Sequence, residues 1–451
     1  MHMLPSFIAN LHNAHDYFAD VLAETGHNFR AHIPQRHIFL TCDPKNVQHI
    51  FTTNHTNFPK GAEFAAIFDI IDGSLFTIDG EPWRRHRAKF QIVLSNPQLV
   101  ASMAACCRDK VENGLLPFFA HMVSIGNPFD IKEVISRFMF DLAATRLFGV
   151  DPGLLSSSMP SMDVALAMDS VMEVGFFRHV IPATCWKAMR DDREEEAQWG
   201  HVCNEEEKGG VDSLSAYIND PDYADDDLLC ATLLNLMLGG RETIATTLLW
   251  IFYNLVQNPN IISNIRNELL PIVSQKVVSS TSAMVIFEPE ETKSLVYLGA
   301  VLYEALRLYP PAPLERKTVV ADDTMPSGHE VHAGDTIIIS LHSMARMEGV
   351  WGIDCDHYNP HRWLSEDGNK LRYVPSHKFL SFNSGPRMCP GKDIAIMQMK
   401  TIVAAVLWNF DMEAMEGQSI QPKLSCILQM KNGLTVKLKK REISITLSIY
   451  M

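Results

Sequence analysis

The sequence lacks the features of a secreted or membrane-spanning protein. Residues 1–8 contain neither a basic segment nor an apolar run long enough for a signal peptide. The only apolar stretch of membrane length, 228–256, carries Arg241 and Glu242 near its middle. Because two charges at the centre of a bilayer are costly, we expect this stretch to be a buried core helix and the chain as given to be soluble.

The sequence is also short of positive charge and of paired cysteines. Its 39 lysines and arginines are outnumbered by 53 acidic residues, and a formal net charge of -14 makes nucleic acid a poor candidate for a partner. Nine cysteines without a C-x-x-C pair argue against a disulfide framework or a zinc ribbon and favour a reducing compartment. No G-x-G-x-x-G motif follows a predicted strand, so we expect no nicotinamide or flavin site in the chain itself.

Neither a repeat nor a linker divides the 451 residues. Helical periodicity dominates, with short β segments near both ends, which predicts a mainly α fold with small β-sheets in a single domain, 1–451. The predicted helices are 44–51, 83–93, 131–148, 160–177, 226–257, 260–272, 295–309 and 391–410. We also expect a strand at 38–41, hairpins at 331–340 and 424–438, and a disordered acidic loop at 191–207.

One ten-residue segment, Phe-Asn-Ser-Gly-Pro-Arg-Met-Cys-Pro-Gly, carries the most chemical information. It sets Cys389 between Gly385 and Gly391, with Arg387 two residues before the sulfur and an apolar helix pattern directly after. A thiolate there would lie near a helix N-terminus, where the helix dipole and free N–H groups favour negative charge. The glycines would let the backbone approach a flat ligand, and Phe382 could shield the sulfur from water. This pattern favours a thiolate ligand for heme iron over a buried structural cysteine.

A second unusual segment lies in the middle of the predicted helix 226–257. Gly239 and Gly240 are unfavourable in a helix by about 1 kcal/mol each, so the pair needs a reason. A local opening of the helix that admits a small ligand would supply one, and the Glu242-Thr243 pair that follows could relay protons there. A close helix–helix crossing at small residues is the alternative explanation.

Together these segments resemble the signatures of the cytochrome P450 family. The cysteine loop matches F-x-x-G-x-R-x-C-x-G at all five fixed positions, and the helix segment resembles A/G-G-x-D/E-T. Three more family motifs occur in the expected order: W-x-x-x-R, E-x-x-R and P-x-R-W/F. Their matching residues here are Trp83 and Arg87, Glu304 and Arg307, and Arg362. The resemblance implies the cytochrome P450 fold and heme b (iron protoporphyrin IX) as the cofactor.

The resemblance also implies roles around the heme. Cys389 would be the axial ligand of the iron. Thr243 would activate oxygen, with Glu242 as its proton-relay partner. Trp83 and Arg87 would bind one heme propionate, and Arg387 is placed to reach the other.

Further roles implied by the resemblance lie outside the heme site itself. Glu304, Arg307 and Arg362 would form a buried structural network. Candidate substrate-pocket residues by family position lie in the segment 64–76 and at Leu236, Gly239, Gly240, Pro313, Leu314 and Ile427.

Segments 57–61 and 346–352 look most like the plant branch of fatty-acid and alkane hydroxylases. This resemblance implies hydroxylation of a small lipophilic substrate with O2 and with electrons from NADPH–cytochrome P450 reductase. Arg84, Arg85, Lys89 and Lys392 would form a positive patch suited to an acidic electron donor. Two alternatives stay open: hydroxylation of a specialised plant metabolite, and a truncated heme-binding protein without monooxygenase turnover.

The sequence departs from the family pattern in two places, the start of the chain and the region that covers the pocket. Family members usually begin with a membrane anchor, which implies the endoplasmic reticulum membrane, whereas the chain as given starts without one, which would leave it cytosolic. The region of about 190–225 is short, so we expect a reduced lid over the pocket.

Overall fold

The structure is a computed structural model that describes residues 10, 13–33, 36–180, 217, 220–223, 225–277 and 284–441. The acidic loop expected at 191–207 lies outside these residues. The same holds for most of the region of about 190–225, where we expect a reduced lid.

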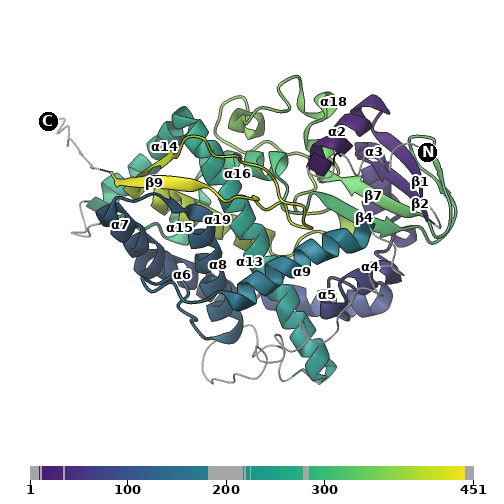
Figure 1. Ribbon diagram of the computed structural model, residues 1–451, viewed down its shortest axis with the longest axis horizontal. Coiled ribbons are helices and arrows are strands. Elements are labelled where there is room, and N and C mark those ends of the chain that lie inside the picture. Colours follow the sequence, from purple (N-terminus) through teal and green to yellow (C-terminus); the bar gives the residue numbers. More distant parts are fainter. Residues whose placement is uncertain are drawn as a thin grey trace.

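A small β-sheet stands at one side of a larger helical body (Figure 1). Its strand order is β1-β2-β7-β4, and the bounds are β1 Asn28–Ile33, β2 Arg36–Thr41, β7 Thr336–Ser340 and β4 Leu314–Thr318. Strands β2 and β7 pair in parallel, with Ile38 opposite Thr336. The sheet therefore joins segments from opposite ends of the sequence into one unit.

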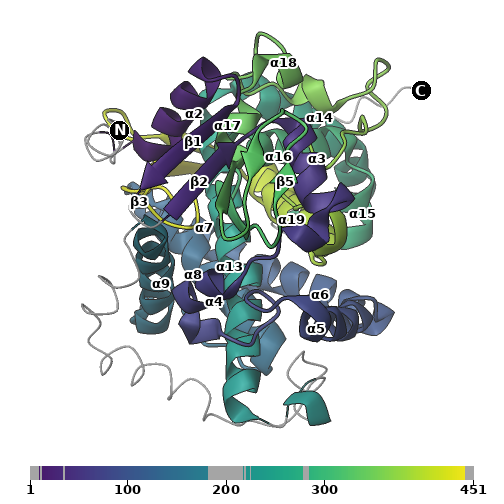
Figure 2. The same ribbon diagram turned by 90° about the vertical axis from the view of Figure 1, so that its right-hand side faces the viewer.

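The helical body is organised around the long helix α13, which runs from the middle of the molecule to its lower end in Figure 2. Helix α13 packs against α8, α16 and α19. The longer helices are α2 Ala14–Glu24, α5 Gly80–Leu94, α6 Pro97–Lys110, α7 Leu116–Ile125, α8 Ile131–Phe148, α9 Asp163–Val180, α13 Asp226–Gln257, α14 Pro259–Val277, α16 Val296–Leu308 and α19 Lys392–Asn409. These contacts build one extensive apolar core, in which Phe252 and Trp408 are almost completely buried.

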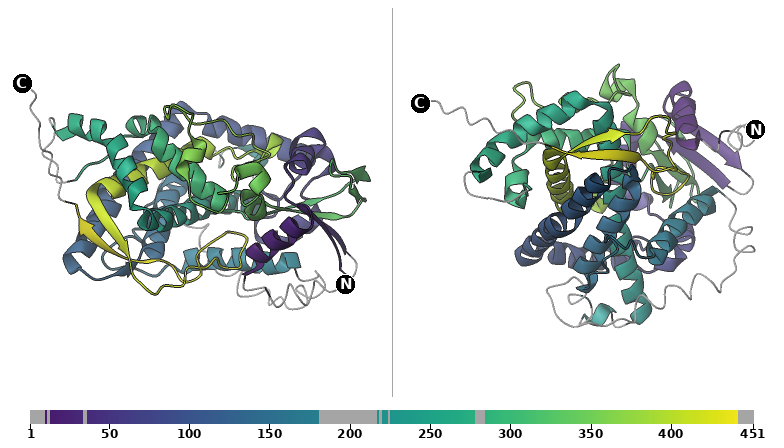
Figure 3. Two further views of the ribbon diagram at one scale, coloured as in Figure 1. Left: turned by 90° about the horizontal axis from the view of Figure 1, so that it is seen from above. Right: turned by 60° about the vertical axis from the view of Figure 1, so that its left-hand side comes forward.

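Short helices and a second sheet complete the fold. The short α-helices are α3 Pro44–Gln48, α4 Ala62–Ile67, α15 Pro289–Lys293, α17 Leu341–Ala345 and α18 Glu348–Trp351. The second sheet has the order β3-β9-β8, with β3 Phe129–Asp130, β9 Thr435–Lys440 and β8 Phe410–Ala414. Seen from above, the yellow strand β9 lies far from the purple strands β1 and β2 (Figure 3, left). A third sheet pairs β5 Asp323–Thr324 with β6 Glu330–Val331.

The predicted class, mainly α with small sheets, is confirmed, and α8 and α13 have the predicted bounds. By length and composition, α13 is the one described helix that could cross a bilayer, and the bent pair of α5 with Pro97–Ile125 would add a second if it counted as one span. The middle of α13 is packed inside the protein, with Arg241 and Glu242 both buried. This agrees with the prediction of a core helix.

Both predicted hairpins are wrong. The segment 331–340 contains strand residues at each end, but β6 pairs with β5 and β7 pairs with β2 and β4. In the segment 424–438, only the last part is a strand, and β9 pairs with β8. The turn signals at Gly334 and Gly433 are real, since both have positive φ angles. What they could not specify is the partner strand, which lies elsewhere in the chain.

Candidate active site

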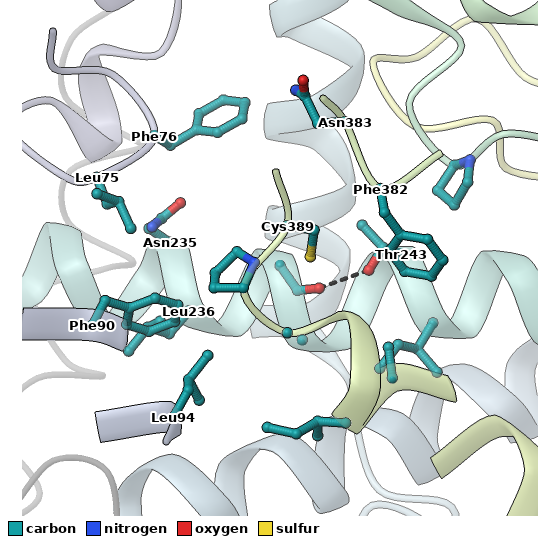
Figure 4. A pocket seen from close by; sticks show the side chains of 18 of the residues that line it. Leu75, Phe76, Phe90, Leu94, Asn235, Leu236, Thr243, Phe382, Asn383 and Cys389 are labelled. Carbon is teal, nitrogen blue, oxygen red and sulfur yellow. Dashed lines mark hydrogen bonds between the residues drawn. The ribbon is translucent and has the colours of Figure 1, made fainter. Parts of the chain in front are cut away.

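A cavity of about 420 Å³ lies between α13, the cysteine loop and α5. Most of its wall is apolar, and Figure 4 shows Leu75, Phe90 and Leu236 on one side of it. The sulfur of Cys389 and the hydroxyl of Thr243 face the same cavity from two different elements. The cavity therefore brings together the two chemical groups that the sequence motifs singled out.

The cysteine loop holds Cys389 with its sulfur open to the cavity. The Cys389 N–H donates to the Phe382 carbonyl at 2.7 Å, which closes the loop directly before α19. Burial raises the pKa of the Cys389 thiol, while a hydrogen bond from the Gly391 N–H and the nearby Arg87 oppose that rise. The predicted helix N-terminus is thus present, but in the protein alone burial outweighs it.

Gly385 lies directly against the backbone of another segment. Its φ is +62°, and a Cβ at this position would lie 1.9 Å from the carbonyl oxygen of Phe51. The structure therefore shows a close approach to the backbone of His49–Thr53, a π-helical turn, which by itself requires a glycine here. Gly391 is less restricted, since a Cβ there would meet the Cys389 sulfur at an ordinary 4.0 Å.

Helix α13 presents its glycines to the cavity. Gly239 and Gly240 are exposed there, and a Cβ on either would meet nothing within 4 Å. The Thr243 hydroxyl donates to the Gly239 carbonyl at 2.7 Å (Figure 4, dashed line). The helix runs continuously through this segment, so the expected opening is not a break in α13. The glycines instead leave free space along the helix surface.

Glu242 lies on the other side of α13, outside the cavity wall. Its carboxylate pairs with Arg241 and accepts a hydrogen bond from Gln429 at 2.9 Å. Burial raises the pKa of Glu242 to about 7, although Arg241 opposes the rise. Glu242 is therefore close to Thr243 in sequence but has no direct access to the cavity.

Trp83, Arg87 and Arg387 lie together at one edge of the cavity. The Arg387 guanidinium stacks on the Trp83 ring at 4.5 Å and pairs with Asp79 at 2.5 Å. Arg87 donates to the Met388 carbonyl, while its Nε is buried without a hydrogen-bond partner among the described residues. Arg87 and Arg387 therefore lie where the motifs predict two cations, and the Nε of Arg87 remains a free donor among the described residues.

The buried network at α16 has the expected members. Arg307 donates to both carboxylate oxygens of Glu304 at 2.8 Å, and Arg362 lies 3.3 Å from one of them. The Trp363 indole N–H donates to Glu304 at 2.8 Å as well. Since Glu304 and Arg307 are at most 2% exposed, this network ties α16 firmly to the 3-10 helix Pro360–Trp363.

The predicted pocket residues are only partly in the wall. Leu236, Gly239 and Gly240 line the cavity, as do Leu75 and Phe76 from the segment 64–76. Three other predicted pocket residues are absent from the wall: Pro313, Leu314 and Ile427.

The structure gives a reason for each absence. The Pro313 carbonyl accepts the Leu341 N–H, and Leu314 pairs with β7, so the chain presents Pro311 and Ala312 instead. Ile427 packs into a separate apolar cluster with Phe68.

The family-model comparison decides the identity of this fold. A model described as Cytochrome P450 matches residues 4–438. The chain belongs to the cytochrome P450 family. Proteins of this family are heme-thiolate enzymes, so the cofactor of this cytochrome P450 is heme b.

The residues at the cavity fit that cofactor. Cys389 offers a sulfur ligand, and the unpaired Nε of Arg87 offers a donor to a carboxylate at the cavity edge. Gly239 and Gly240 leave space along α13 on the facing wall.

Curated relatives cover almost the whole chain. Noroxomaritidine synthase 1 from Narcissus pseudonarcissus is 33% identical over 98% of this chain and 90% of its own length. Alkane hydroxylase MAH1 from Arabidopsis thaliana is 31% identical over 98% of this chain and 92% of its own. Cytochrome P450 86B1, also from Arabidopsis thaliana, is 32% identical over 98% of this chain and 85% of its own. This cytochrome P450 is thus similar to plant enzymes with differently named activities.

The expected positive patch is largely neutralised. Lys89 of α5 pairs with Asp220 at 2.6 Å and with Asp222 at 2.5 Å. Arg84 pairs with Glu81, and Arg85 lies 3.5 Å from Asp222. Lys392, by contrast, has no ion pair among the described residues and lies over aromatic rings. Glu81 lies on α5 itself, but the sequence could not reveal the pairing with Asp220 and Asp222, because these two acids come from a segment far along the chain.

Lys60 is one of the charged groups at the cavity that the sequence analysis did not single out; Arg146 and Glu315 are others. The Lys60 side chain is buried and lines the cavity near Arg387. In the sequence, Lys60 belongs to the segment 57–61, which was informative only as a family resemblance. Burial of a lysine cannot be read from such a segment.

Proposed function

We propose that this cytochrome P450 hydroxylates long aliphatic chains, such as fatty acids or alkanes, with Cys389 as the axial ligand of the heme iron. The observation that carries the proposal is the cavity itself. Its wall is mostly apolar, and the Cys389 sulfur and the Thr243 hydroxyl both open into it. An apolar wall binds a lipophilic substrate and excludes water from the reacting centre.

Each residue at the cavity has a proposed task. Heme would supply the activation of dioxygen, so that one oxygen atom enters a C–H bond of the substrate and the other leaves as water, with two electrons from a redox partner and two protons. Thr243 holds a proton at its hydroxyl, which it now donates to the Gly239 carbonyl, within reach of the same space. Trp83, Arg87 and Arg387 orient the cofactor through its propionates. Leu75, Phe76, Leu236 and Phe90 form the apolar surface that orients the substrate.

Glu242 can deliver protons only indirectly. Its carboxylate is turned away from the cavity and held by Arg241 and Gln429. A proton from Glu242 would therefore reach Thr243 only after a change of side-chain conformation. Because burial raises the pKa of Glu242 to about 7, the group can exchange a proton near neutral pH.

The choice of substrate rests on relatives and on the wall of the cavity. The name of one relative, Alkane hydroxylase MAH1, agrees with an enzyme acting on aliphatic chains. A second candidate is a specialised plant metabolite, favoured by the 33% identity to noroxomaritidine synthase 1. Direct binding measurements separate the two.

We further propose NADPH–cytochrome P450 reductase as the electron donor and the endoplasmic reticulum membrane as the place of action. A family member needs a redox partner, O2 and an organic substrate. The sequence offers no nicotinamide or flavin motif of its own, so electrons have to come from another protein.

The primary test is the difference spectrum of the reduced protein with carbon monoxide. The wild-type protein is expected to show the red-shifted band of a heme thiolate, and Cys389→Ala is expected to lose it. Cys106→Ala, which removes another free thiol, serves as the control and should keep the band. A red-shifted band in Cys389→Ala would refute the ligand assignment.

The substrate and turnover need a second measurement. We expect fatty acids and alkanes to shift the heme absorbance on binding, and turnover with the reductase to give hydroxylated products. A shift with specialised plant metabolites, and none with fatty acids or alkanes, would support the specialised-metabolite alternative. A protein with the thiolate band but no product from any substrate would be a heme-binding protein without turnover.

A further inference from the structure

Two lysines that no motif contains are buried beside the heme cavity. Lys60 precedes α4 and is 4% exposed, and Lys317 lies in β4 and is 3% exposed. Lys60 lines the main cavity, whereas Lys317 lines a second cavity of about 210 Å³. Trp83 and Arg387 line both cavities and so stand between them.

Neither ammonium group has a hydrogen bond or an ion pair among the described residues. The Lys60 Nζ lies 3.6 Å from the centre of the Phe76 ring and 4.3 Å from that of Phe64. The Lys317 Nζ lies 4.8 Å from the centre of the Phe51 ring. Aromatic faces offset only part of the loss of water around a buried cation. A nearby anion would therefore stabilise a buried ammonium group in this position.

The surrounding charges do not supply enough anions. Six cations line the two cavities. Arg84 pairs with Glu81, and Arg146 lines the main cavity from α8. The other four are Lys60, Lys317, Arg87 and Arg387. The acids beside them are Asp79, which pairs with Arg387, and Glu315, which accepts a hydrogen bond from Asn383. Four positive charges against two negative ones leave an excess of two. Heme b carries two propionate carboxylates, which would balance that excess.

Burial changes the pKa of both lysines. It lowers the pKa of Lys60 to about 7 and also lowers the pKa of Lys317. Glu315 opposes the shift at both, whereas Arg387 adds to it. A bound anion would restore the ordinary affinity of these groups for their protons.

We propose that Lys60 and Lys317 are further cofactor-binding residues, whose ammonium groups pair with the heme propionates on either side of Arg387. A substrate carboxylate is the competing anion. It would reach Lys60 from the main cavity but would leave Lys317, in the second cavity, without a counterion. Two carboxylates on one edge of a rigid ring can meet cations in both cavities.

The test measures heme retention and needs neither substrate nor reductase, so it stands apart from the proposed hydroxylation. Purified protein is mixed with excess apomyoglobin, and the rate of heme transfer is followed by absorbance. We expect Lys60→Met and Lys317→Met each to lose heme about tenfold faster than wild type, which corresponds to about 1.4 kcal/mol. Lys60→Arg should stay close to wild type, and the exposed Lys439→Met is the matched control.

A second probe separates charge pairing from general damage to the fold. The protein is reconstituted with hemin or with hemin dimethyl ester, which lacks the propionate charges. Wild type should lose the ester faster than hemin, and Lys60→Met should narrow that difference. Equal acceleration for hemin and ester, or wild-type rates in both methionine variants, would overturn the proposal.

Two further results would contradict the proposal. If Lys60→Met leaves heme retention unchanged but weakens the spectral shift caused by lauric acid, Lys60 recognises substrate and the proposal fails. The heme-free Lys60→Met protein should unfold at the same temperature as wild type or higher, because an unpaired buried charge is gone. A lower unfolding temperature without heme would point to a structural role and against this one.

Discussion

Adjacent residues of one helix can serve different parts of the protein. Successive side chains of α13 point about 100° apart, so Thr243 faces the cavity while Glu242 is packed behind the helix with Arg241. The motif predicts that Glu242 and Thr243 act together on oxygen. The structure separates the pair into a group at the cavity and a group in the core.

The placement of Thr243 leads to a prediction about coupling. In Thr243→Ala the proton at the cavity is lost, so electrons should leave as hydrogen peroxide and product per electron should fall on the order of tenfold. Peroxide release and product are measured against NADPH consumed. Thr243→Ser keeps the hydroxyl and should stay coupled. An unchanged product yield in Thr243→Ala would count against a role in oxygen activation.

At the residue scale, the sequence predicts what a fixed spacing can carry. Cys389, Thr243 and Trp83 could be singled out because local spacing places them on a loop or on a helix face, and all three line the cavity. Lys60 could not be singled out in this way. Its proposed role depends on its burial close to Lys317, which comes from a distant part of the chain. The contact of Gly385 with the Phe51 carbonyl could not be predicted, because Phe51 lies far away in the sequence.

At the scale of elements, the same E-x-x-R spacing occurs in two very different settings. Glu304 and Arg307 are buried in α16, whereas Glu81 and Arg84 pair on the exposed side of α5 at 3.1 Å. Spacing alone cannot tell them apart. Burial decides how much each pair contributes to stability.

These two pairs form a matched test of stability. Glu304→Gln leaves Arg307 buried without its partner, so the free energy of unfolding should fall by about 3–5 kcal/mol. Glu81→Gln should change it by less than about 1 kcal/mol. Denaturant unfolding of both variants measures the difference. Similar losses in the two variants would show that the α16 network does not hold the fold together.

The contact between the cysteine loop and the turn His49–Thr53 predicts a second difference between variants. In Gly385→Ala the new Cβ would overlap the Phe51 carbonyl, and the positive φ adds strain. Gly417 also has a positive φ, but a Cβ there meets nothing within 4 Å. Gly417→Ala should therefore cost only the strain, about 1–2 kcal/mol.

Gly385→Ala should cost more than this and should also lower the heme content, because the loop that carries Cys389 has to shift. Thermal unfolding and the ratio of heme to protein absorbance measure both effects. If Gly385→Ala and Gly417→Ala have the same unfolding temperature and heme content, the overlap with Phe51 does not destabilise the protein.

Helices were predicted well and strand partners poorly, for a physical reason. The apolar periodicity of α8 and α13 is local, and their bounds match the prediction. Strands β6 and β7 were expected to pair with each other because only a short turn separates them. Strand β7 instead lies between β2 and β4, since the apolar faces of the larger sheet need a central strand there.

At the scale of the whole molecule, charge is arranged by segments that meet only after folding. The basic residues of α5 look like a docking surface in the sequence, yet Lys89 is already paired with Asp220 and Asp222. Lys392, at the start of α19 and next to the cysteine loop, is the cation of that group without an ion pair among the described residues. An acidic electron donor would therefore gain most from Lys392.

This arrangement predicts different effects for two single changes. Lys392→Ala should slow reduction of the protein by the reductase about threefold to tenfold at low ionic strength, and salt should remove the difference. Lys89→Ala should have a smaller effect, because that charge is already balanced within the protein. Stopped-flow reduction over a range of salt concentrations measures both, with heme content as the check that the site is intact. A larger effect of Lys89→Ala would mean that its acidic partners release it when the donor binds, and would place the docking surface on α5.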